Sequence, residues 1–352
     1  MTKQRVAVTG GLGYIGLHLC RKLRLRGYDV RVIDKGIFPS GVAAIHTFAP
    51  GCEVRIKDLR KVTRDDFVGC VAVCNLGGFS NDPTSELAGY DANISFNVDA
   101  TMTTAHSALA VDCYRFIQAS SASVYGFSEQ VDLDEYSPVN PASDYAESKL
   151  LAETELLNMV SDDLEPVILR QATVGGWSPR MRWDLVVNTM VMTSLRDGVI
   201  NVNAGGEASR PLIDVQDVAD AHIRCIEAPS GDVGGEVFNL THRRARDEQG
   251  AEGYRIASLG LWIARILESE HGVKVAVRGN WDRTEGRSYD ISGKKLRRVL
   301  DWEPTRTVGH MVSSIMDHRP ELNFSDPETR NLDWMLAMKH AQEIIKRDGS
   351  VW

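Results

Sequence analysis

A tyrosine and a lysine four residues apart, Tyr145 and Lys149, are the first candidates for chemistry in this sequence. Asp144 and Glu147 have the spacing of a capping box, which predicts a helix that begins at about Tyr145. Residues four apart on a helix share one face, so the lysine ammonium would lie beside the phenol. That charge would lower the pKa of the phenol from about 10 toward working pH and make Tyr145 a general base toward a substrate hydroxyl. Such pairs also occur on solvent-exposed helices, where they do no chemistry.

A serine-rich segment upstream gives this pair more weight. The sequence SSASVYG occupies residues 120–126, directly after a predicted strand at Tyr114–Ala119. A serine hydroxyl there could hydrogen-bond the reacting oxygen and hold it against the tyrosine. Serine, tyrosine and lysine beside a nicotinamide would form a site for hydride transfer. This interpretation requires a dinucleotide site elsewhere in the chain.

Three glycines near the N-terminus supply that site. Gly10, Gly13 and Gly16 have GxxGxxG spacing between a predicted strand, Arg5–Thr9, and a predicted helix, Leu12–Arg26. Glycine is needed where the backbone turns tightly, where it approaches a pyrophosphate and where the helix packs on the strand. Free N–H groups at the helix N-terminus also attract phosphate. The alternative is a plain tight turn, but an acidic residue after the second predicted strand favours dinucleotide binding.

That acidic residue is Asp34, at the end of the predicted strand Asp29–Asp34. Its carboxylate would accept hydrogen bonds from the adenosine ribose and repel a 2′-phosphate, which favours NAD over NADP. Lys35 could soften that repulsion. Asp58 and Leu59 follow the third predicted strand and would either meet the adenine or form a plain turn.

Together these motifs resemble the extended short-chain dehydrogenases/reductases, and among them the nucleotide-sugar epimerase/dehydratase group. The pattern of the group's 4-epimerases, GGxGYIG…SSATVYG…YxxSK, is nearly repeated here, and the resemblance covers residues 1–310. It implies bound NAD, a nucleotide-diphosphate sugar as substrate, and a catalytic triad of Ser121, Tyr145 and Lys149. It also implies cofactor contacts at Tyr14, Ile15, Leu76, Gly77, Gly78 and Asn97, and sugar contacts at Ser80, Asn81 and Ser123.

Arginines in the second half of the chain could bind the substrate diphosphate, because the planar guanidinium binds phosphate oxygens bidentately. Arg210, in the segment RPLID, matches a diphosphate arginine of the family, and Arg287, ahead of LDWEP, matches a second one. Arg180 and Arg182 are further candidates, equally well explained as charges on a solvated loop. Thr173 stands where the family usually has an asparagine and would contact the sugar.

The residues after the catalytic strand bear on the reaction. Dehydratases and decarboxylases of the group carry an acid there, as in TDEVYG, whereas this chain has Ala122 and Ser123. The resemblance therefore favours an NAD-dependent 4-epimerase, which removes hydride from sugar carbon 4 and returns it. Reduction of a 4-keto sugar by NAD(P)H is the alternative. A non-catalytic NAD-binding scaffold is more remote, since Tyr145 and Lys149 are both present.

The elements that must position these residues alternate strand and helix before residue 175, which is typical of a parallel sheet covered on both faces. We expect a Rossmann-type doubly wound α/β domain at 1–175, a smaller mixed α/β substrate lobe at 176–320 and a C-terminal helical extension at 321–352. The other predicted strands are Glu53–Ile56, Val71–Leu76 and Val167–Arg170, and the other helices are Ile94–Val111, Tyr145–Met159 and Asp326–Arg347. The helices Ile94–Val111 and Tyr145–Met159 would form the family's homodimer interface, unless they are simply buried.

The composition disfavours several other classes. The chain has 352 residues, 43% of them hydrophobic and 25% charged, which is ordinary for a soluble globular protein. A net charge of −8 argues against nucleic acid as a partner. No apolar run could span a bilayer, and the segment before the first strand is too short for a signal peptide, so a cytoplasmic protein is expected.

The cysteines and histidines show no metal-binding spacing, and we expect no metal. Cys70 and Cys74 flank a Val-Ala-Val run and should face one side of a strand, most simply as buried free thiols. The polar segment Thr241–Tyr254 lacks any period and is predicted to be a surface loop.

Overall fold

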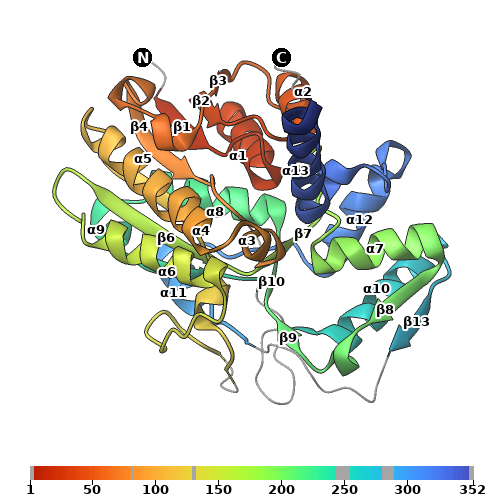
Figure 1. Ribbon diagram of the computed structural model, residues 1–352. Helices are drawn as coiled ribbons and strands as arrows, with labels where there is room; N and C mark the ends of the chain where they lie inside the picture. Colours follow the sequence, from red (N-terminus) through yellow and green to blue (C-terminus); the bar gives the residue numbers. More distant parts are fainter. Residues whose placement is uncertain (1–3, 81, 129–131, 243–253, 280–288, 349–352) are drawn as a thin grey trace.

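The computed structural model describes residues 4–80, 82–128, 132–242, 254–279 and 289–348. Among these residues, seven parallel strands form the largest sheet, in the order β3-β2-β1-β4-β5-β6-β11 (Figure 1). Helices lie on both faces, so the expected Rossmann-type α/β fold is confirmed. The strands are β1 Arg5–Thr9, β2 Asp29–Asp34, β3 Glu53–Ile56, β4 Cys70–Asn75, β5 Arg115–Ser121, β6 Glu165–Gln171 and β11 Val237–Leu240.

These strands form where the sequence has short apolar runs, many of them β-branched. In β1, Val6, Ala7 and Val8 are fully buried, because a central parallel strand is covered on both faces. Every strand predicted before residue 175 occurs, with ends that agree to within two residues.

A β-bulge in β4 overturns one prediction about the cysteines. Arg5 pairs with Cys70 but Val6 pairs with Ala72, so β4 carries one extra residue between them. The extra residue shifts the alternation of the side chains. Cys70, before the bulge, and Cys74, after it, therefore point to opposite faces of the sheet. Cys70 packs in the apolar cluster on one side of the sheet, and Cys74 packs in the cluster on the other side. Both thiols are buried and free, but the expectation that they share a face is wrong.

The helices on the sheet fall into two layers. Helices α1 (Tyr14–Leu25) and α8 (Val215–Glu227) pack on each other and on one face (Figure 1). Helices α5 (Ala100–Leu109) and α6 (Asp144–Leu157) contribute Ala105 and Leu156 to the cluster on the opposite face.

Two of the predicted helices begin differently from the expectation. The predicted helix at 94–111 starts as a π-helix, Ile94–Asp99, and becomes α-helical only at Ala100. Helix α6 begins at Asp144, one residue early, because Ser143 is the N-cap and its hydroxyl accepts a hydrogen bond from Ala146 N at 3.2 Å. Asp144 and Glu147 therefore lie in the first turn and do not form the expected capping box.

After residue 175 the chain builds a second lobe and also returns to the main sheet, where β11 pairs with β6. The second lobe contains a parallel pair, β8 (Val199–Val202) and β13 (Ala276–Gly279), which packs against α7 (Val186–Asp197) and α10 (Ile256–His271) (Figure 1). Most of the predicted loop at 241–254 lies outside the described residues. The other α-helices and strands after residue 172, apart from α8 and the C-terminal helix, are α9 Ser230–Val233, α11 Lys294–Leu300, α12 Val308–Asp317, and the short pairs β7 Thr173–Gly175 with β10 Leu212–Asp214 and β9 Ser209–Arg210 with β12 Tyr254–Arg255.

The C-terminal helix, α13 (Asn331–Asp348), runs back across the molecule to the loop before α2 (Pro39–Phe48) (Figure 1). It begins five residues later than predicted, because the Asp326 carboxylate accepts a hydrogen bond from Glu328 N and caps a separate 3₁₀ turn. No helix in the described part of the chain is long and apolar enough to cross a membrane.

Candidate active site

The predicted site residues gather at the carboxyl ends of the central strands. The chain leaves β1 toward β2 and leaves β4 toward β5, so the order of the sheet switches between β1 and β4. Ligands of open α/β sheets bind in the crevice at such a switch point. The glycine turn follows β1 there, Leu76 and Gly77 follow β4, and Ser121 ends β5.

The three glycines of the turn have different surroundings. A Cβ on Gly10, whose φ is +68°, would lie 2.8 Å from Gly77 N, and a Cβ on Gly16 would lie 2.5 Å from Gly10 O. These two glycines are therefore required by the protein's own packing. A Cβ on Gly13 would meet only Gly10 O, at 3.1 Å, and Gly13 caps α1 without a side-chain hydrogen bond. The open space and free N–H groups at this point fit a phosphate.

Asp34 ties the end of β2 to the glycine turn. Its carboxylate accepts hydrogen bonds from Leu12 N at 3.1 Å and from Gly36 N at 2.8 Å, and burial raises its pKa. This position suits the adenosine ribose of a dinucleotide. Lys35 is half exposed and lies 3.3 Å from Asp58, which is held by Arg60 as well. Leu59 lies against Gly77, where a Cβ would meet its side chain at 2.2 Å.

The structure brings Ser121, Tyr145 and Lys149 together. Lys149 is buried and donates a hydrogen bond to Ala119 O at 3.2 Å, and its ammonium lies 5.8 Å from the centre of the Tyr145 ring. Ser121 accepts a hydrogen bond from Ser123 Oγ at 2.9 Å and is close enough to Tyr145 to lower the pKa of its phenol. The three side chains come from β5 and the first two turns of α6.

Burial changes the electrostatics expected for this triad. It raises the pKa of Tyr145 to about 12, although contact with Ser121 acts in the opposite direction. It also lowers the pKa of Lys149 to about 8, against the effect of the Glu153 carboxylate. Burial of the Tyr145 phenol thus acts against the predicted fall of its pKa toward working pH, because desolvation disfavours the phenolate.

The π-helix places Asn97 beside the same crevice. Its side-chain nitrogen donates to Ser148 Oγ at 2.9 Å, and its buried oxygen has no hydrogen-bond partner in the described residues. A Cβ on Gly78 would lie 2.3 Å from that oxygen. An unsatisfied buried acceptor at this point fits a cofactor donor group, and π-helical turns often occur at functional sites.

A buried ion pair behind the triad was missed by the sequence analysis. The Glu153 carboxylate lies 2.8 Å from Arg170, and both side chains are almost fully buried. Ser120 also hydrogen-bonds Glu153, and Arg170 donates to Tyr125 Oη at 3.0 Å. The feature of the sequence that could have indicated this ion pair is the position of Glu153, one helical turn after Lys149 and on the same face.

On the substrate side, the two neighbouring arginines, Arg180 and Arg182, are both buried. Arg182 is 7% exposed, pairs with Asp184 at 2.8 Å and donates to Ser80 Oγ at 3.1 Å. Its charge acts on the Tyr145 phenol in the direction that lowers the phenol pKa. Arg180 is 2% exposed, and the charges of Arg182, Asp184, Glu328 and Asp34 act on its guanidinium. The alternative of two charges on a solvated loop is therefore wrong.

Two further predicted substrate residues, Thr173 and Arg210, lie on the short strands β7 and β9. Thr173 is partly buried in β7, and its N–H donates to Pro211 O at 3.0 Å. The Arg210 guanidinium lies 5.2 Å from the centre of the Tyr289 ring. Arg287 and Asn81 lie outside the described residues.

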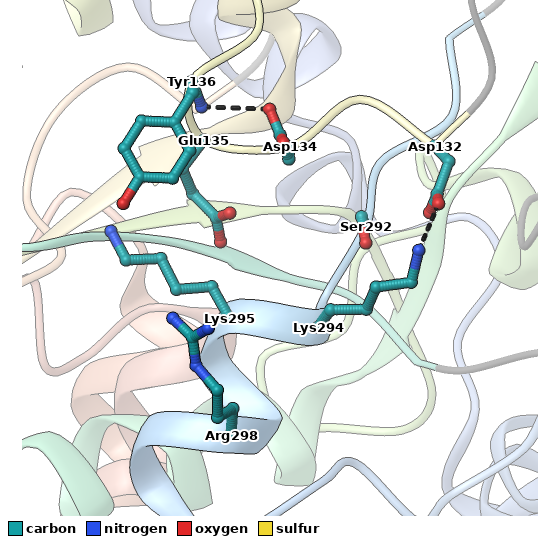
Figure 2. A pocket seen from close by; sticks show the side chains of 8 residues that line it. All are labelled: Asp132, Asp134, Glu135, Tyr136, Ser292, Lys294, Lys295 and Arg298. Carbon is teal, nitrogen blue, oxygen red and sulfur yellow. Dashed lines mark hydrogen bonds and ion pairs between the residues drawn. The ribbon is translucent and has the colours of Figure 1, made fainter.

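A pocket of about 250 Å³ lies apart from the triad, between the loop at 132–136 and α11. Figure 2 shows acids of the loop facing basic side chains of the helix. Lys294 pairs with Asp132 at 2.5 Å, and Lys295 pairs with Glu236 at 2.6 Å. These charges are already paired within the protein, so the pocket is not the candidate active site.

Comparisons with known proteins agree with this geometry. A model described as the NAD dependent epimerase/dehydratase family matches residues 6–241. A UDP-glucose 4-epimerase of Rhizobium leguminosarum bv. trifolii is 27% identical over 347 residues, covering 92% of this chain and 99% of the relative. A UDP-glucose 4-epimerase of Azospirillum brasilense is 29% identical and covers 85% of this chain and 87% of the relative.

Solved structures share the fold over most of the chain. The UDP-glucuronic acid 4-epimerase of Bacillus cereus, in complex with UDP-glucuronic acid and NAD, has a TM-score of 0.76 at 21% identity, and covers 91% of this chain and 100% of that chain. An NAD-dependent NDP-hexosamine 5,6-dehydratase of tunicamycin biosynthesis has a TM-score of 0.73 at 21% identity, and covers 92% and 100%. At these identities the likeness shows the fold alone.

Proposed function

Since this chain belongs to the NAD-dependent epimerase/dehydratase family, we propose that it is a nucleotide-sugar 4-epimerase with Tyr145 as its acid–base residue. The grouping of Ser121, Tyr145 and Lys149 beside the glycine turn carries the proposal. Curated relatives named as UDP-glucose 4-epimerases over nearly the whole chain support it.

Each residue of the triad has a distinct part in the proposed reaction. Bound NAD would accept a hydride from sugar carbon 4 and return it to the opposite face. Tyr145 takes the proton of the hydroxyl on that carbon and later gives it back. Ser121 donates a hydrogen bond to the same oxygen and orients it. Lys149 stabilises the phenolate that forms on Tyr145, because its ammonium is buried beside the ring.

The absence of an acid in the strand-end motif favours epimerisation over dehydration. Dehydration requires a second proton transfer at a neighbouring carbon, and Ala122 and Ser123 supply no carboxylate for it. Asp82 raises the pKa of Tyr145, but it accepts a hydrogen bond from Ser143 at 2.5 Å at the start of α6. Its carboxylate is thus engaged at the start of that helix.

The substrate diphosphate is assigned to the arginines of the second lobe. Arg210 stacks near Tyr289, and Tyr289 in turn affects the pKa of Tyr145, so Arg210 borders the site. We assign Arg287, two residues before Tyr289, to the same diphosphate.

We also propose a homodimer through α5 and α6, which light scattering of the purified protein would test.

The experiment is incubation of the purified protein with UDP-glucose, UDP-N-acetylglucosamine and UDP-glucuronic acid, with products identified by NMR. We expect the C4 epimer of at least one sugar to form without added cofactor. Tyr145→Phe should form none. Turnover that requires a 4-keto sugar and added NADPH or NADH would favour the reductase instead.

A further inference from the structure

Arg180 has fewer partners than a buried cation normally has. Its side chain is 2% exposed and lies over the Phe38 ring, 3.7 Å from the ring centre. In the part of the chain that the structure describes, its guanidinium makes one hydrogen bond, from Nη2 to Asn331 Oδ1 at 2.5 Å, and its Nε has no partner. Burial lowers its pKa to about 9. Asp184, Glu328 and Asp34 act on its charge, but among the described residues none of them forms an ion pair with it. A buried guanidinium without an ion pair is costly unless an anion joins it.

The backbone before Arg180 places it over the start of α1. Tyr14 Oη donates to Gly176 O at 2.5 Å, and Ser178 Oγ donates to Tyr14 O at 2.9 Å. The segment that leads to Arg180 is therefore fixed to the first residue of α1, directly after the glycine turn. Asp34, at the other side of the turn, acts on the Arg180 charge as well, after Asp184 and Glu328. Arg180 thus lies where a dinucleotide passes from its ribose to its phosphates.

The start of α13 holds Arg180 in this place. Asn331 is 6% exposed, and its side chain accepts from Arg180 and donates to Ser80 Oγ at 2.7 Å. It therefore joins Arg180 to the loop after β4.

The same C-terminal segment is fastened to the loop after β2. Trp334 Nε1 donates to Ile37 O at 2.6 Å, and Glu328 accepts from Ser40 N at 2.8 Å. Between these two contacts, Thr329 O accepts from Trp183 N at 2.7 Å. Residues 328–334, which we term the C-terminal clasp, thus connect the loops on both sides of the glycine turn (Figure 1).

We propose that Arg180 binds the diphosphate of NAD from the side opposite the glycine turn, and that the C-terminal clasp holds Arg180 there and closes the cofactor in. Release of NAD then requires the clasp to open. This assignment moves Arg180 from the substrate, where the sequence placed it, to the cofactor. It rests on the proposed function in one respect, since an epimerase that recycles NAD in place gains from retaining it.

The test measures cofactor retention without any sugar. Each purified protein is loaded with NAD, and the exchange of bound NAD against isotopically labelled NAD is followed by mass spectrometry of the released nucleotide. Arg180→Met removes the cation, and Asn331→Asp gives Arg180 a carboxylate that competes with the diphosphate. Trp334→Phe removes only the hydrogen bond to Ile37. Lys339→Ala, on the exposed face of α13, is the matched control.

We expect exchange to become about tenfold faster or more in Arg180→Met and Asn331→Asp, the size of one lost charge-assisted hydrogen bond. Trp334→Phe should show a smaller increase, and Lys339→Ala none. Wild-type exchange rates in Arg180→Met and Asn331→Asp, with folding verified by circular dichroism, would overturn the proposal. So would loss of NADPH binding with NAD binding intact, since Arg180 would then serve a 2′-phosphate. Failure to epimerise any sugar would contradict the proposed function but leave these exchange rates unaffected.

Discussion

The Glu153 carboxylate acts on the Lys149 ammonium from one helical turn away on α6, and raises its pKa against the effect of burial. Glu153 is itself almost fully buried and paired with Arg170. Lys149, the proposed catalytic lysine, is thus coupled to the buried ion pair of Glu153 and Arg170. The pH at which Lys149 loses its proton therefore depends on this ion pair, and so does the pH dependence of the proposed reaction.

We first predict that kcat falls as the pH rises through about 8. Lys149, whose pKa burial lowers to about 8, loses its proton in this range, and its charge no longer stabilises the Tyr145 phenolate. The pH–rate profile of the NAD-loaded enzyme would show this alkaline limb. Lys149→Met should lack the limb and react roughly 10²-fold more slowly. A wild-type rate that is flat or rises up to pH 10 would contradict the role of the ammonium.

We next predict that the two partners of the buried ion pair shift this limb in opposite directions. Glu153→Gln removes the charge that raises the pKa of Lys149, so the limb should move to lower pH. Arg170→Gln leaves the carboxylate unpaired, so the limb should move to higher pH. Both variants should lose about 3–5 kcal/mol of unfolding free energy, since each leaves a buried charge alone. Equal stability losses with an unmoved limb would show that the pair is only structural.

Ser121→Ala should reduce kcat by about 10²-fold, the effect of removing one positioned donor from a reacting oxygen. Because Ser121 also lowers the pKa of Tyr145, the phenol of the variant should ionise at higher pH than that of the wild type. Ultraviolet difference titration would measure the phenol, with Ser123→Ala as the neighbouring control. Unchanged phenol titration in Ser121→Ala would refute the contact.

The glycine turn should respond differently at two of its positions. Gly16→Ala would place a Cβ 2.5 Å from Gly10 O, so it should destabilise the fold. Gly13→Ala would meet only Gly10 O, at 3.1 Å, so the fold should stay nearly as stable while NAD binding weakens. Thermal unfolding and NAD titration would separate the two effects. NAD binding at wild-type strength in a folded Gly13→Ala variant would contradict this placement of the cofactor.

The sequence predicted the sheet well because its central strands are apolar runs separated by helices of clear periodicity. It could not reveal the bulge in β4, since the extra residue is apolar like its neighbours and only the pairing with β1 exposes it. Nor could it predict the raised pKa of Tyr145, because burial depends on elements far along the chain.

The proposed role of Arg180 could not be predicted from the sequence for the same reason, because it depends on residues far along the chain. Its partner Asn331 lies 151 residues further along the sequence, on a helix whose start was placed at Asp326. The glycine turn and the YAESK motif were recognisable because their chemistry depends on local spacing. The C-terminal clasp depends on distant contacts, and local spacing gives no sign of it.

In the proposed reaction, hydride leaves sugar carbon 4 and returns to the same carbon without an added reductant. The most direct measurement uses a UDP-sugar with deuterium at carbon 4, incubated with the purified protein in ordinary water without added NAD. We expect the 4-epimer to form with its deuterium retained at carbon 4. An epimer that has exchanged the label for solvent hydrogen, or turnover only when NADPH or NADH is supplied, would contradict it.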